Sequence, residues 1–207
     1  MAEAITGEFG SGPVVGRTDW RKFGVVMVPA LAAATAVVIG VAQGAVAASF
    51  QVSGQSFAVS FDRFSGQDFQ QFAAVDTGAD GERYPVAPTG IRRMEAERMC
   101  QSVAVPVPVV GTVVVRLTAG EDDRPVSARN LVVDTEELRG EAEFTNVSIG
   151  QDAGTFDEVP GHTGRAGLFG QRADSVEVSH LKQRARAATA GTFRLPGLRM
   201  RVGTGVP

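Results

Sequence analysis

Residues 103–117 read VAVPVPVVGTVVVRL, and this stretch decides the class of fold. Valine stands at every second position from 103 to 109, and again at 113 and 115 before Leu117. A period of two places apolar side chains on one face of a β-strand. Pro106 and Pro108 have no N–H to donate to a neighbouring strand, so we expect them at a sheet edge or at a strand entrance. The stretch therefore predicts strands.

The same alternation recurs on both sides of this stretch. Four segments combine an alternating strand, a polar turn and a second alternating strand, and their starts lie about 35 to 45 residues apart: residues 55–72, 91–109, 131–149 and 176–195. Such spacing is typical of stacked β layers, as in a solenoid, or of a long meandering sheet. The sequence predicts a mainly β fold of this kind, with a β-sandwich as the alternative. Residues 64–72 and 181–190 would each also allow a short helix.

A long uncharged segment precedes the strands. No charged residue stands between Phe23 and Phe61, and residues 23–42 are almost wholly apolar. A helix rises about 1.5 Å per residue, so about 20 apolar residues cross a bilayer core of roughly 30 Å. We therefore predict a transmembrane helix that serves as a membrane anchor and includes Phe23, Val25, Val26, Leu31, Val37 and Ile39.

The residues on either side of this segment bear on its orientation in the membrane and on whether it is cleaved. Arg17, Arg21 and Lys22 precede it, and cations of this kind favour the cytoplasmic side. Ala45 and Ala47 form a small-x-small motif that signal peptidase prefers, but a signal peptide has an apolar region of only about 7–15 residues. We expect a retained, single-pass membrane anchor with an extracytoplasmic C-terminal domain. Secretion after cleavage is the alternative.

Three regions follow from these observations. Residues 1–22 are expected to be a disordered cytoplasmic tail, residues 23–49 the transmembrane helix or signal sequence, and residues 50–207 an exported β-rich domain. Cys100 is the only cysteine, so no disulfide can form within the chain. We expect its thiol to be buried as a small apolar group, with a disulfide to another chain as the alternative.

Charge bears on the partners. The formal net charge of -3 argues against binding to nucleic acid. Acidic residues concentrate between residues 121 and 158, and basic residues between residues 161 and 201. These are either two oppositely charged faces of one domain, or a basic surface that contacts anionic lipid or a wall polymer.

The sequence offers little for catalysis. Residues 54–58, with Ser56 at their centre, approach the nucleophile elbow of hydrolases, but Ala58 replaces its final glycine. His162 and His180 are the only histidines, and Asp157 or Glu158 would have to orient His162. The acidic turns lack the spacing of a calcium loop, so we predict no metal, no cofactor and no enzyme.

Five blocks of sequence resemble a known family: residues 99–103, 130–134, 144–153, 170–174 and 190–198. They are similar to a family of actinobacterial envelope proteins of unknown function, whose members often carry the label cholesterol esterase. The resemblance implies an anchored, exported domain and a small multi-pass membrane protein as partner. It supplies no catalytic residues.

Three functions are therefore considered. The first is a non-enzymatic envelope scaffold that binds a multi-pass membrane partner or copies of itself through exposed strand edges. The second is a carrier of lipid or of a hydrophobic metabolite, because twelve phenylalanines and the alternating valines would line a groove. The third is a lipid ester hydrolase that uses Ser56.

Overall fold

The computed structural model describes residues 55–79, 81–121 and 123–204, together with Trp20, Phe23, Val25, Met27, Val28, Pro29 and Leu31. The chain divides into two units, Met1–Ile39 and Gly40–Pro207. In the first unit, the described residues are helical and exposed. Within the part of the chain that the structure describes, no helix has both the length and the apolar character needed to cross a membrane.

The predicted anchor falls mostly outside the described residues. Phe23, Val25 and Leu31 belong to the helical residues of the first unit. The other predicted residues of the anchor, its cationic flank and its cleavage motif lie outside the described part: Val26, Val37, Ile39, Arg17, Arg21, Lys22, Ala45 and Ala47. The anchor, its orientation and its cleavage therefore stay predictions.

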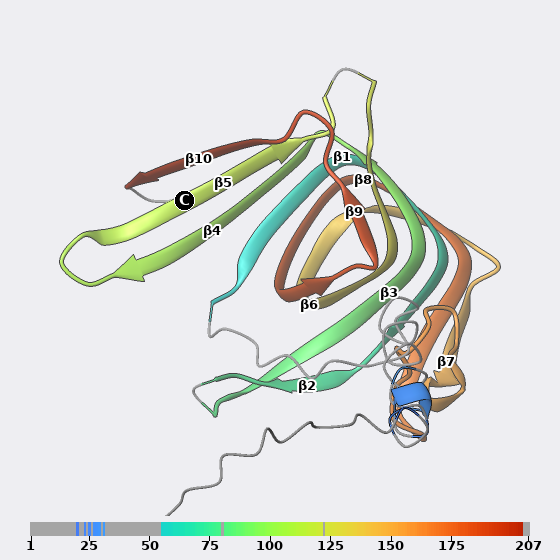
Figure 1. Cartoon of the computed structure of the whole chain (residues 1–207). Helices are drawn as coiled ribbons and strands as arrows, with labels where there is room; N and C mark the ends of the chain where they lie inside the picture. Colours follow the sequence, from blue (N-terminus) through green and yellow to red (C-terminus); the bar gives the residue numbers. More distant parts are fainter. Residues whose placement is uncertain are drawn as a thin grey trace, which may run out of the picture. The chain divides into compact units, whose positions relative to one another are not determined.

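The second unit is an antiparallel β-sheet, as Figure 1 shows. Its described elements are β1 (Phe57–Phe72), β2 (Ala74–Thr77), β3 (Arg83–Glu97), β4 (Met99–Val107), β5 (Gly111–Ala119), β6 (Val126–Thr145), β7 (Ser148–Asp152), the 3-10 helix η1 (Ala153–Thr155), β8 (Phe169–Thr189), β9 (Thr192–Arg194) and β10 (Arg199–Thr204). The mainly β fold predicted from the alternation is confirmed.

Four long strands form a closed ring of hydrogen-bonded pairs. β1 pairs with β3, β3 with β6, and β6 with β8, in chain order. β8 then pairs with β1 along almost its whole length, from Phe57 opposite Ala185 to Phe72 opposite Gly170. Residues 55–72 contain β1, and each of the other three predicted segments overlaps one further strand of this ring in part. The pairing of the first with the last differs from a solenoid, in which a repeat contacts only its neighbours.

Residues in the left-handed conformation bend the ring strands. Asp68 in β1, Asn130 in β6 and His180 in β8 have φ values of 55°, 49° and 52°. Asp and Asn adopt this conformation more readily than most residues, and an irregular residue inside a strand bends it and increases its twist. The bends let strands of 16, 20 and 21 residues curve around a common interior.

A three-stranded arm extends from the ring (Figure 1). β4 pairs with the start of β1, β5 pairs with β4, and β10 pairs with β5. Pro106 lies where β4 has left β1, since that pairing ends at Val103. Pro106 thus stands on a strand edge, and Pro108 lies in the turn after β4, so neither missing N–H interrupts a strand pairing.

Two predicted helices are wrong. Residues 64–72 belong to β1, and residues 181–189 belong to β8. Both segments are hydrogen-bonded to neighbouring strands along two edges, and this pairing overrides their weak local preference for a helix.

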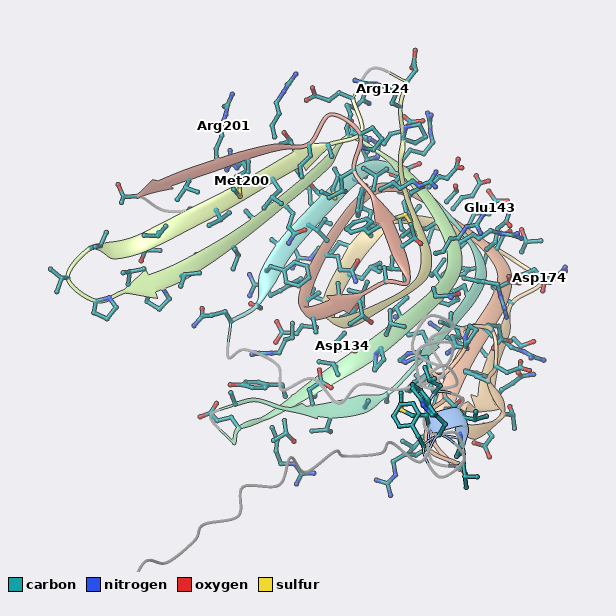
Figure 2. The ribbon with its side chains drawn as sticks, viewed as in Figure 1. Arg124, Asp134, Glu143, Asp174, Met200 and Arg201 are labelled. Carbon is teal, nitrogen blue, oxygen red and sulfur yellow. The ribbon has the colours of Figure 1, made fainter. Side chains whose placement is uncertain are left out.

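Ion pairs join the acidic and basic parts of the sequence. Arg186 pairs with Glu136 at 2.6 Å, Arg172 with Glu158 at 3.0 Å and Arg199 with Glu121 at 2.9 Å, each distance between a side-chain nitrogen and a carboxylate oxygen. The two charged stretches therefore attract each other across the sheet. Other acidic side chains, such as Glu143 and Asp174, point away from the outer side of the curved sheet (Figure 2).

Candidate binding cavity

The ring encloses a cavity of about 380 Å³. Its lining comes from all four ring strands, with additions from β4 and β9. Most of the lining side chains are Phe, Val, Leu, Ile, Met or Ala, and the described lining residues include no charged side chain. Protein interiors are normally packed with few voids larger than a water molecule. A cavity of this size inside a sheet is therefore room for a ligand.

The period-two pattern directs these side chains inward. Phe57, Val59 and Phe61, the alternating residues of β1, all line the cavity. On β6, Leu138 and Phe144 do so as well, yet these two side chains remain 43% and 38% exposed. Large apolar side chains that face inward and still meet solvent mark the cavity as open on the side of β6.

A chain of polar side chains also crosses the interior. We call Gln71, Thr89, Thr135, Gln171 and Gln183 the polar belt. Gln171 Nε2 donates to Gln71 Oε1 at 2.7 Å, and Gln71 Nε2 donates to Thr89 Oγ1 at 2.7 Å. The hydroxyls of Thr89 and Thr135 lie 3.4 Å apart, and Gln183 Nε2 donates to Thr135 Oγ1. The belt satisfies polar groups that would be costly to bury alone, and it involves every strand of the ring.

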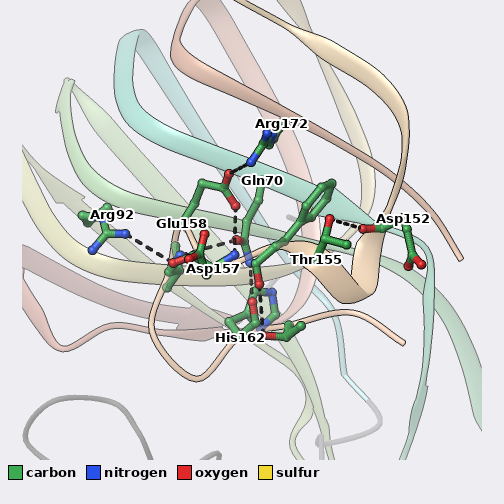
Figure 3. Close-up of polar contacts among 11 residues, drawn as sticks. Gln70, Arg92, Asp152, Thr155, Asp157, Glu158, His162 and Arg172 are labelled. Atoms are coloured by element: carbon green, nitrogen blue, oxygen red, sulfur yellow. Dashed lines mark hydrogen bonds and ion pairs between the residues drawn. The ribbon is translucent and has the colours of Figure 1, made fainter. Parts of the chain in front are cut away.

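A loop covers the outer face of β1 and β3. We call residues 153–168 the strap; Figure 3 shows its polar contacts. The side chain of Gln70 is fully buried and faces away from its neighbour Gln71. Its amide donates to the His162 carbonyl oxygen and accepts from the Val159 N–H. The carboxylate of Asp152 receives the N–H groups of Gly154 and Gly167, each at 2.8 Å, which fixes both ends of the strap.

His162 is a packing residue of the strap. Its ring lies 5.0 Å from the ring of Phe72, between centroids, and its Nε2 is buried without a hydrogen-bond partner among the described residues. Burial lowers the pKa of the imidazole to about 4, because the charged form would lose its hydration. The ring is therefore neutral at pH 7.

The structure does not assemble the triad considered from the sequence. The carboxylate of Glu158 pairs with Arg172, and Nε2 of His162 has no hydrogen-bond partner among the described residues, so the acid–histidine pair of a triad is not formed. His180 is exposed on β8, and Ser56 stands just before β1. Among the described residues, no histidine side chain hydrogen-bonds to Ser56 or to a carboxylate.

Two carboxyl groups have unusual environments. Burial raises the pKa of Asp134 to about 6, and the nearby carboxylate of Asp76 adds to the rise. Burial also raises the pKa of Asp76, against the influence of the Arg186 guanidinium. That guanidinium carbon stands 3.4 Å from the centre of the Tyr84 ring. In the described part of the chain, no group of His, Cys, Asp and Glu is arranged to hold a metal ion.

Cys100 lies on β4 as a half-buried free thiol. It borders a shallow depression shared with Ser60, Arg139, Lys182 and Arg184. Its disulfide to another chain stays a prediction.

Sequence reasoning missed the polar belt, although a signal was present. Each belt residue stands two positions from a large apolar residue of the same strand: Gln71 from Phe69, Thr89 from Ile91, Thr135 from Val133, Gln171 from Phe169 and Gln183 from Leu181. By the period of two, each shares a face with that residue. A glutamine in the apolar register of a strand was the available indication of a polar group in the interior.

The fold and the site together define a mainly β protein whose antiparallel strands enclose an apolar cavity crossed by a polar belt. The chain belongs to a family of unknown function (DUF6230), whose model matches residues 53–207 and so includes β1 to β10. No curated protein and no solved structure matches the chain. The membership agrees with the uncharacterised family inferred from the five sequence blocks.

Proposed function

We propose that this protein binds and carries an apolar small molecule inside the ring of β1, β3, β6 and β8. The observation that carries the proposal is the cavity of about 380 Å³ with an uncharged, largely apolar lining. Small-molecule sites commonly measure about 300–1,000 Å³ and combine an apolar wall with a few placed polar groups. An acyl chain or a sterol has the chemistry that such a wall accepts.

The free energy of burying exposed apolar surface favours ligand binding in the cavity. Apolar surface removed from water contributes roughly 25 cal/mol per Å². Leu138, Phe144 and Phe193 all line the cavity and stay between 38% and 44% exposed. A ligand would cover these side chains and its own apolar surface at the same time, which stabilises the complex.

The predicted anchor fits the same role. With residues 23–42 in the membrane and the sheet on the extracytoplasmic side, the cavity would stay close to a source of lipid. The retained anchor remains our proposal for localisation, and secretion after Ala47 remains its alternative.

Recovery of bound lipid from the purified protein tests the proposal. We expect native mass spectrometry of the full chain to show an apolar adduct that organic extraction releases. Ala142→Phe should reduce this adduct at least threefold, because Ala142 lines the cavity and is exposed to it. Ala58→Phe serves as the matched control, since Ala58 is exposed on β1 and faces away from Val59. Wild-type protein without any adduct, and without uptake of added lipid, would refute the carrier function.

A second function, a scaffold, is favoured by the arm. β10 pairs with β5 through residues 199–204, and all six of these residues are exposed. Met200 and Val202 are 65% and 63% exposed, and Met200 and Arg201 project from the strand in Figure 2. An exposed edge strand with apolar side chains is a template for another strand. Chemical cross-linking in membranes should join β10 to a multi-pass partner or to a second copy, and the double change Met200→Glu and Val202→Glu should abolish this product.

A further inference from the structure

The polar groups of the cavity fall into two sets that differ in their free hydrogen-bonding capacity. Gln71 uses both its amide oxygen and its amide nitrogen within the polar belt. Gln183 donates one hydrogen bond, to Thr135, and its oxygen accepts none among the described residues. Gln101 also lines the cavity, and its side chain forms no hydrogen bond with any described residue. Gln171, whose nitrogen donates to Gln71, likewise has an amide oxygen that accepts no hydrogen bond among the described residues. Gln101 and Gln183 retain donors and acceptors for a ligand and, unlike Gln171, they flank the same residue of β1.

The register places these two glutamines on either side of one residue. Val59 of β1 pairs with Gln101 of β4 on one edge and with Gln183 of β8 on the other. Paired residues point to the same face, and neighbouring strands lie about 4.8 Å apart. The two α-carbons are thus separated by about 10 Å, with both amides facing the cavity across Val59. A head group of a few atoms between them would reach both amides.

The remaining lining determines the charge of the ligand. The described side chains around the cavity include neither a cation nor an anion. A carboxylate or an ammonium group placed there would be buried without a counter-charge, which is strongly unfavourable. A hydroxyl or a neutral amide would exchange its hydrogen bonds with water for hydrogen bonds with the two glutamines.

We infer that the ligand is a neutral amphipath, whose uncharged hydroxyl or amide head binds between Gln101 and Gln183 and whose apolar body lies along the phenylalanines of β1. This inference rests on the proposed carrier function and narrows it. Free fatty acids and other anionic lipids are excluded as preferred ligands, and a pure hydrocarbon lacks the head that the glutamines recognise.

Competition among three probes of equal chain length tests the inference. The full chain, purified in a mild detergent, is loaded with the apolar dye Nile red and titrated with hexadecan-1-ol, hexadecanoate or hexadecane. We expect the alcohol to displace the dye at a concentration about tenfold lower than either other probe, because it alone offers a neutral donor and acceptor. In the double variant Gln101→Leu, Gln183→Leu, this preference should fall to threefold or less while the dye still binds.

A control variant and the contrary outcomes distinguish a failure of the neutral head group from a failure of the carrier function. Gln67→Leu removes a glutamine that is exposed on β1 and paired with Arg93, and it should leave the preference for the alcohol unchanged. Equal displacement by hexadecanoate, or an unchanged preference in the double variant, would overturn the neutral head group and leave the carrier function standing. A wild-type protein that binds neither the dye nor any probe would refute the carrier function itself. Thermal melts of each variant check that the fold is retained.

Discussion

His162 shows how a single buried group makes stability depend on pH. Its pKa is lowered to about 4 in the folded chain, whereas an unfolded histidine titrates near 6.5. As the pH falls from 6.5 to 4, the unfolded chain takes up a proton that the folded chain refuses, so the free energy of unfolding decreases. The shift corresponds to about 3 kcal/mol over that range.

We expect His162→Phe to remove this acid-induced loss, because a phenyl ring can stack on Phe72 and does not titrate. Urea unfolding followed by circular dichroism at pH 4.5 and pH 7.5 measures it. His180→Asn is the control, since Asn also tolerates the left-handed conformation found at position 180. A pH dependence that is equal in His162→Phe and in the wild type would contradict the burial of a neutral imidazole.

Asp134 changes the free energy of unfolding with pH in the opposite direction to His162. Its folded pKa of about 6 lies above the ordinary 3.8, so the folded chain holds a proton that the unfolded chain has released. Stability from this group is complete below pH 4 and is lost as the pH rises to 6. Allowing for its partial exposure to solvent, we expect Asp134→Asn to raise the free energy of unfolding by about 1–2 kcal/mol at pH 7.5.

At pH 3 the same substitution should change little, because the aspartic acid is then largely protonated in both the folded and the unfolded chain. Glu143→Gln, which changes an exposed carboxylate on the outer side of β6, is the comparison. Destabilisation by Asp134→Asn at pH 7.5 would show that the carboxylate has a favourable partner and that its charge is not a burden.

At the scale of single residues, the sequence predicted the apolar lining better than the polar site. Phe57, Val59 and Phe61 were expected on one face because their alternation is local information. The position of Gln101 and Gln183 on either side of Val59 depends on the registers of β4 and β8 against β1, although the two glutamines are about 80 residues apart in the sequence. No local pattern contains that register.

Among the elements, the strap depends on small residues beneath it. A Cβ atom at Gly90 would lie 2.9 Å from Gln70 Cγ and 3.1 Å from both His162 Cδ2 and Val159 Cγ2. We expect Gly90→Val to displace the strap and to lower the free energy of unfolding by about 1–3 kcal/mol, as overpacking does. Valine itself favours strands, so the backbone of β3 should persist.

Limited trypsin digestion measures the displacement, because Arg165 is exposed in the strap and becomes easier to cleave once the strap loosens. Gly203→Val is the control, since no atom would meet its Cβ atom within 4 Å. Equal cleavage rates at Arg165 in the two variants would show that the strap does not rest on Gly90.

The elements themselves were partly predictable. Alternation identified β5, the second half of β4, the start of β1 and the middle of β8, because a period of two survives in the sequence wherever one face is buried. The second halves of β1 and β8 looked compatible with helices because left-handed residues such as Asp68 and His180 interrupt their period. The bends that close the ring are thus the same features that obscured its strands.

Over the whole domain, closure of the ring is the property that sequence patterns could not supply. β1 and β8 pair over 14 positions, from Phe57 with Ala185 to Phe72 with Gly170, so the paired residues lie about 100 or more positions apart in the sequence. Their alternation predicts that each buries one face, but it is equally compatible with a sandwich, a stack or a ring. The cavity exists only because the first and last long strands meet.

A closed ring around an incompletely filled interior should draw part of its stability from its ligand. A molecule that binds only the folded state adds RT ln(1 + [L]/Kd), about 2.7 kcal/mol at a hundredfold excess over Kd. For a domain of this size, that corresponds to a rise in melting temperature of roughly 5–10 °C. We therefore expect protein stripped of lipid to melt lower and to recover when hexadecan-1-ol is added at constant detergent.

The dependence on the cavity distinguishes this effect from a general action of the alcohol on the micelle. Ala142→Phe occupies part of the cavity with its own side chain, so its melting temperature should respond less to the alcohol than that of Ala58→Phe. If the alcohol raises the melting temperature of both variants equally, the stabilisation does not arise inside the ring. If the alcohol raises the melting temperature of Ala58→Phe more than that of Ala142→Phe, the ligand binds in the unfilled interior that the pairing of β1 with β8 creates.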